Sequence, residues 1–148
     1  MFWIKEAVKN LTCQYNSIDP FELASLKRIQ VIPWNLHEDI QGFYKYDKRN
    51  KYIFINNNLD ESHQKFVCAH EFGHSQLHPR VNTPFLRGNT LYSINKLEVE
   101  ANTFAVELLL PDEAIYDLNN TSTTIYELAS SYGIPKEVCH LKSITTNT

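Results

Sequence analysis

The pattern of apolar and polar positions predicts helices at both ends of the chain and strands near its middle. Apolar residues recur at helical spacing over residues 2–11, and Asp19-Pro20 is typical of the start of a second short helix. Residues 28–33 alternate as a strand does. Two β-rich runs, 42–46 and 51–55, flank a polar four-residue turn, so they are expected to form a hairpin.

The second half of the sequence reads as helices separated by loops. Asp60 can cap a helix that continues to about Leu77, a polar loop follows over residues 80–89, and a helix over 96–110 ends at Pro111. Two more helical segments, 125–131 and 135–143, are joined by a turn at Gly133. This pattern predicts one domain over residues 1–118 and a helical tail over residues 119–148.

Composition narrows the class of protein. With 148 residues, 43% of them hydrophobic, and a net charge of −3, the chain is expected to be a globular domain rather than a disordered one. The absence of an overall positive field disfavours a protein whose main work is neutralising phosphates, but it does not exclude nucleic acid locally. Three widely spaced cysteines and no apolar run long enough for a membrane span favour a cytoplasmic protein.

The strongest chemical signal is a cluster of histidines on the helix predicted to begin near Asp60. His70, Glu71 and His74 form an H-E-x-x-H motif. Residues four apart lie on one helix face, so both imidazoles can reach one metal ion while Glu71 handles a bound water. Because the motif can arise by chance on an amphipathic helix, it needs a third ligand to be convincing.

Two glutamates on the next predicted helix compete for that place. At about 100° per residue, Glu98 shares a face with Asn102 and Ala105, whereas Glu100 points toward the opposite side. A carboxylate on a packed face is costly unless it is paired with a cation, so we expect Glu98 to be the third ligand. Asn102 is expected to orient a ligand, and Glu100 to belong to a solvated face.

The remaining histidines and one cysteine have weaker claims. On a continuous helix His78 lies about 12 Å from His70, too far to share its ion. A histidine at the helix end favoured by the dipole is the simpler interpretation of His78, with a role toward substrate or in orienting a ligand as the alternative. His63 is expected to be exposed, and Cys68 to be a packed apolar residue.

Several segments together resemble the ImmA/IrrE family of zinc metallopeptidases. The matching pieces are, in order, residues 19–24, 42–44 and 53–56, 66–74 with Leu77-His78, and 98–105 running into 107–111. The resemblance covers roughly residues 15–115. It implies an α+β, zincin-like fold in which the helix with the motif packs on a short sheet. It also implies cleavage of a helix-turn-helix repressor of a prophage or other mobile element.

The chemistry expected of such a site is zinc-dependent peptide hydrolysis. Zn²⁺ held by His70, His74 and Glu98 would activate a water, and Glu71 would move its proton. A second electrophile could be Tyr92 or His78, and the sequence does not choose between them.

Two other functions remain as alternatives. One is a regulatory module with a zinc site that grips a repressor or DNA without cutting. The other is a DNA-binding regulator that uses the tail, which is similar to the helix-turn-helix-like tail of the family. Direct DNA binding by the tail is disfavoured because its second predicted helix offers only Lys136 and Lys142 as basic residues. The oligomeric state does not follow from the sequence.

Overall fold

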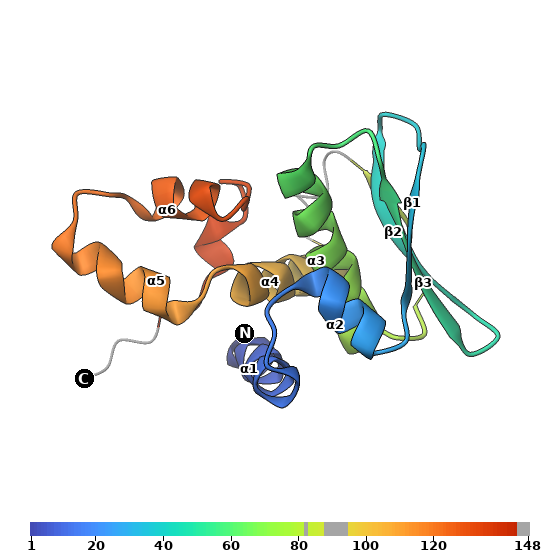
Figure 1. The fold of residues 1–148 in the computed structure, drawn as a ribbon, viewed down its shortest axis with the longest axis horizontal. Helices are drawn as coiled ribbons and strands as arrows, with labels where there is room; N and C mark the ends of the chain where they lie inside the picture. Colours follow the sequence, from blue (N-terminus) through green and yellow to red (C-terminus); the bar gives the residue numbers. More distant parts are fainter. Residues whose placement is uncertain (82, 88–94, 145–148) are drawn as a thin grey trace.

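A four-stranded mixed sheet lies at one side of the molecule, and the helices gather on one of its faces (Figure 1). The structure, a computed structural model, describes residues 1–81, 83–87 and 95–144. The strands are β1 (Gln30–Trp34), β2 (Ile40–Asp47), β3 (Asn50–Asn56) and β4 (Thr83–Arg87), in the order β1-β3-β2-β4. β1 runs parallel to β3, and the other two pairings are antiparallel. The expected α+β class is therefore confirmed.

The predicted hairpin of β2 and β3 is present, but its turn is shorter than the sequence indicated. Asp47 pairs with Asn50, so only Lys48 and Arg49 lie in the turn. Both have positive φ, 49° and 67°, which is the backbone of a two-residue type I′ turn. The four polar residues had predicted a four-residue turn, and this was wrong because the outer two belong to the strands.

The other difference in the sheet is β4. Its residues fall in the stretch that had been interpreted as a loop, because the segment contains a proline and has no alternating apolar pattern. β4 pairs with β2 alone and so forms an edge of the sheet, the place where a strand tolerates proline.

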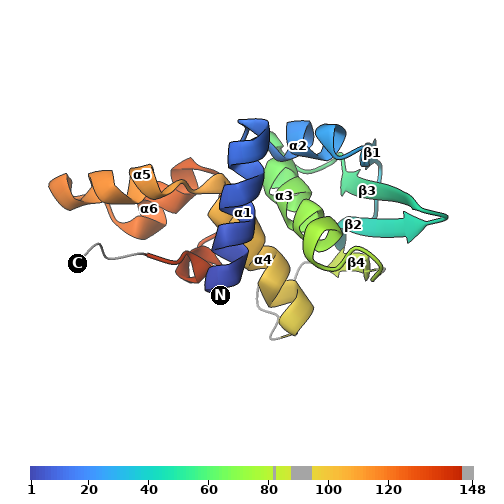
Figure 2. The same cartoon turned by 90° about the horizontal axis from the view of Figure 1, so that it is seen from below.

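Two long helices carry the core. α3 (Glu61–Leu77) packs on β2 and β3, and α4 (Lys96–Leu109) packs across α3. The bounds of both agree with the sequence prediction. Gly42 on β2 lets α3 approach the sheet, since a Cβ there would lie 2.7 Å from Cγ1 of Val67. Figure 2 shows α1 (Phe2–Tyr15) crossing α4, while α2 (Pro20–Leu26) lies beside α3 (Figure 1).

The C-terminal segments pack against the same core. They are α5 (Asp112–Tyr116), the 3₁₀ turns η2 (Asp117–Asn120) and η3 (Cys139–Leu141), and α6 (Ile125–Ser131). Ala129, Ile134 and Val138 are buried in the main hydrophobic cluster. The helix predicted over 135–143 was wrong, because only the single turn η3 forms there. The side chain of Glu107 accepts the Ser143 N–H at 2.8 Å and holds this segment to α4.

The described helices include none that combines the length and the apolar character needed to cross a membrane.

Candidate metal centre

His70 and His74 lie one turn apart on the buried face of α3. Asp60 caps the helix by accepting the backbone N–H of His63, as the sequence predicted. Both imidazoles are fully buried, and their ring centroids are 4.8 Å apart. The spacing of four residues thus places two ring nitrogens side by side, as the motif requires.

Glu98, in the first turn of α4, meets both histidines. Its carboxylate oxygens lie 3.2 Å from Nε2 of His70 and 3.0 Å from Nε2 of His74. Nevertheless, both nitrogens and one of the carboxylate oxygens are buried without a hydrogen-bond partner. Burying polar atoms without hydrogen-bond partners costs folding free energy. Ligands about 2.0–2.1 Å from a tetrahedral ion lie about 3.3–3.4 Å apart, so the three side chains fit a metal such as zinc.

Glu71 lies against this group from the same helix. Its carboxylate is buried, and one oxygen lies 3.9 Å from Nε2 of His70. The ligand atoms of His70, Glu71 and His74 lie within 4.8 Å of one another. Burial raises the pKa of the Glu71 carboxyl to about 8, so this group can exchange a proton near neutral pH.

The protonation of the three converging residues is uneven. Burial lowers the pKa of His74 to about 4, which leaves its imidazole neutral and able to bind a cation at neutral pH. Burial also opposes a charge on His70, but contact with Glu98 and the charge of Glu71 outweigh it and raise the pKa of His70. Burial disfavours ionised Glu98, yet its contacts with His70 and His74 hold its pKa below the ordinary value.

A second set of polar groups holds the imidazoles from behind. Nδ1 of His70 lies 2.7 Å from Oδ1 of Asn102, so the ring donates there and keeps the lone pair of its Nε2 free. Nδ1 of His74 lies 3.1 Å from Nδ1 of His78, whose Nε2 lies 3.6 Å from a carboxylate oxygen of Glu100. Asn102 therefore lies where the sequence analysis placed it.

Glu100 corrects an expectation. It is 5% exposed rather than solvated, because α4 is covered on more than one side, by α3, by α1 and by the C-terminal segment. His78 is the C-cap residue of α3, the helix-end position of the simpler interpretation, and it is buried between His74 and Glu100. The long apolar stretch of α4 could have indicated, from the sequence alone, that a second face of this helix is buried too.

The other candidates lie away from the centre or outside the described residues. His63 is exposed and contacts Asp60, and Cys68 is buried in the core, both as expected. Tyr92 lies outside the described residues. Sequence reasoning missed Tyr44, whose backbone N–H bonds Glu71 and whose hydroxyl donates to the Pro79 carbonyl at 2.6 Å.

Comparison with known proteins decides the family. The peptidase M78 family model, described as the IrrE N-terminal-like domain, matches residues 25–142. The chain belongs to this family. The match extends past residue 118, the last residue of the predicted first domain, and the boundary between that domain and the tail stays a prediction.

Two curated relatives agree with this membership. The chain is 57% identical over 142 residues to the uncharacterized immunity region protein 2 of Bacillus phage phi105, covering 96% of the chain and 90% of the relative. It is 31% identical over 112 residues to the metallopeptidase ImmA of Bacillus subtilis (strain 168), covering 76% of the chain and 66% of the relative. No solved structure matched the chain. Membership supports a metallopeptidase with a protein substrate.

Proposed function

We propose that the protein is a zinc-dependent, site-specific endopeptidase that cleaves a helix-turn-helix repressor of a mobile element in the cytoplasm. One observation carries the enzymatic part of this proposal. His70, His74 and Glu98 converge with buried, unpartnered ligand atoms, and Glu71 lies beside them. A structural zinc site usually takes all four ligands from the protein, whereas this group offers three and a carboxylate suited to proton transfer.

Each residue of the candidate site would have its own role in peptide hydrolysis. Zinc, when bound, would polarise the scissile carbonyl and acidify the attacking water. His70, His74 and Glu98 would hold it. Glu71 would take the proton of the water and pass it to the leaving amine, a role that suits a buried carboxyl of raised pKa. Asn102 and His78 would fix the two imidazoles so that each Nε2 faces the ion.

The substrate assignment rests on the relatives. One of them is named for a phage immunity region and another is named a metallopeptidase, which supports a peptidase that acts on the regulator of such a region. A repressor encoded beside the peptidase is the substrate that would link peptide hydrolysis to the control of immunity. Cleavage of that repressor would relieve repression.

Incubation of the zinc-loaded protein with the neighbouring repressor tests both parts. We expect the wild type to produce two fragments, and Glu71→Gln to slow their formation by about 10²- to 10⁴-fold while binding zinc normally. Glu38→Gln, a matched change at an exposed loop residue, should cut like the wild type. Full cleavage by Glu71→Gln would refute the assignment of the base. Zinc-bound wild type that grips the repressor without cutting it would favour the regulatory alternative.

A further inference from the structure

The face of the sheet that points away from α3 carries its own row of aromatic and apolar side chains. Tyr44, Ile53 and Ile55 are buried beneath α3, and side chains alternate along a strand. The residues between them therefore point to the opposite face. From the three paired strands these outer residues include Ile32, Trp34, Phe43, Tyr52 and Phe54.

No helix among the described residues covers this outer face (Figure 1). Trp34 at one end of it is 60% exposed. Phe43 and Phe54 face each other across the strands as a stacked pair, with centroids 4.6 Å apart and planes 15° apart. The result is an aromatic surface that is partly open to solvent, with the Trp34 ring as its most exposed part.

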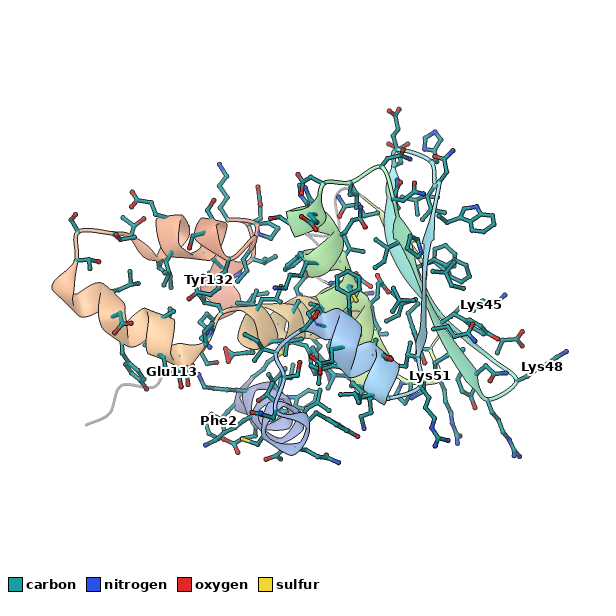
Figure 3. The ribbon with its side chains drawn as sticks, viewed as in Figure 1. Phe2, Lys45, Lys48, Lys51, Glu113 and Tyr132 are labelled. Atoms are coloured by element: carbon teal, nitrogen blue, oxygen red, sulfur yellow. The ribbon has the colours of Figure 1, made fainter. Side chains whose placement is uncertain are left out.

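Positive charge gathers at the hairpin end of the same sheet. Four of the seven residues from 45 to 51 are Lys or Arg, against one acid, Asp47. Lys27 and Arg28 lie at this end too, just before β1, whose Gln30 pairs with Tyr52 next to Lys51. Figure 3 shows Lys45 and Lys48 extending from this end, with Lys51 nearby.

These cations lack acidic partners within the described part of the chain. None of the six takes part in an ion pair there, whereas Lys5 and Lys142 are both paired with carboxylates. Burial, followed by the charge of Lys27, lowers the pKa of Lys51, as expected where like charges crowd. Two of the six have other contacts: Lys51 donates to the Ser75 carbonyl at 3.4 Å on the α3 side of the sheet, and Lys27 lies over the Tyr15 ring. The hairpin cations Lys45, Lys48 and Arg49 are exposed, and Lys45 alternates to the same outer face as Phe43.

We infer that this surface, the aromatic outer face with its basic hairpin end, binds single-stranded nucleic acid. Phosphates would lie against the hairpin cations, and bases would stack on Trp34 and on the Phe43–Phe54 pair. Proteins that bind single strands combine these two elements, a basic track and exposed aromatic faces. An acidic peptide would need the cations and would gain little from the exposed ring of Trp34, so this ring favours the nucleic acid.

Fluorescence anisotropy with the full chain and labelled oligodeoxythymidine or oligouridine of roughly 15 nucleotides tests the inference at low salt. We expect binding that weakens as salt is raised. Lys45→Glu/Lys48→Glu/Arg49→Glu should weaken it by about 10-fold or more, because three phosphate contacts become repulsive. Trp34→Ala should weaken it by about 5-fold or more through the loss of base stacking.

The matched control is Lys9→Glu/Lys65→Glu/Lys136→Glu, which changes net charge equally at exposed positions elsewhere. It should bind within about 3-fold of the wild type if the hairpin cations form the site. Equal loss in both triple variants, or no binding by the wild type, would overturn the inference. Wild-type affinity in Trp34→Ala would also overturn it, in favour of an acidic protein partner. The assay needs no cleavage, so its outcome is independent of the proposed peptidase activity.

Discussion

Glu100 and His78 are predicted to strengthen metal binding without touching the ion. His78 contacts Nδ1 of His74 at 3.1 Å, and Glu100 lies 3.6 Å behind His78. With Nδ1–H of His74 donating to His78, the Nε2 of His74 keeps its lone pair for the metal. Removing a partner of this kind typically costs 10- to 100-fold in metal affinity, about 1.4–2.8 kcal/mol.

We therefore expect Glu100→Gln to raise the zinc dissociation constant by about 10-fold, and His78→Ala to raise it further, toward about 100-fold. Glu100→Gln removes the negative charge of the side chain and keeps its shape, so we expect it to weaken zinc binding less than His78→Ala does. His78→Ala removes the contact to His74 altogether and leaves one buried ring nitrogen without a partner.

Competition with a chelating dye of known zinc affinity measures the change directly. Glu38→Gln, at an exposed loop position, serves as the control and should bind zinc like the wild type. Thermal unfolding of the metal-free proteins separates loss of affinity from loss of fold. If Glu100→Gln and His78→Ala both bound zinc as tightly as the wild type, the reasoning about these outer contacts would be refuted.

Three further predictions concern the scaffold. Gly42→Ala should destabilise the fold by about 1–3 kcal/mol in urea unfolding, because its Cβ would lie 2.5 Å from the carbonyl oxygen of Phe54; unchanged stability would contradict this packing. Lys142→Ala should cost about 3 kcal/mol by the same assay, because among the described residues it leaves buried Glu107 with Lys5, at 3.5 Å, as its one cation; a loss under about 0.5 kcal/mol would contradict it. In the native protein at pH 8, a thiol reagent should modify only the exposed Cys13 quickly, because burial raises the pKa of the thiols of Cys68 and Cys139. After unfolding it should modify all three cysteines, and three fast-reacting thiols in the native protein would contradict the burial.

The two histidines at the centre of the site could be predicted from the sequence because helical periodicity depends only on residues close together in the chain. His70 and His74 are four residues apart on one helix, so their approach needed no knowledge of the fold. Glu98 followed from the cost of a carboxylate on a packed helix face, and the structure brings it to both imidazoles. Its role as a ligand stays a proposal. The same argument failed for Glu100, because it treated α4 as having one buried face.

Features that depend on partners distant in sequence were harder to predict. β4 has little strand character of its own and is defined by its pairing with β2. The chain after Pro135 reads as a helix, yet contacts of Lys142 and Ser143 with Glu107 accompany a single 3₁₀ turn instead. The hairpin turn was predicted two residues too long because Lys48 and Arg49 are unusual in a type I′ backbone, which favours Asn and Gly.

The most direct test of the central claim is the position of zinc itself. An anomalous difference map from crystals of the zinc-loaded protein, collected at the zinc absorption edge, would locate the ion. The account predicts one peak per chain, about 2.0–2.2 Å from Nε2 of His70, Nε2 of His74 and a carboxylate oxygen of Glu98. A peak that is bound by Glu71 in place of Glu98, or that lies away from both histidines, would contradict it.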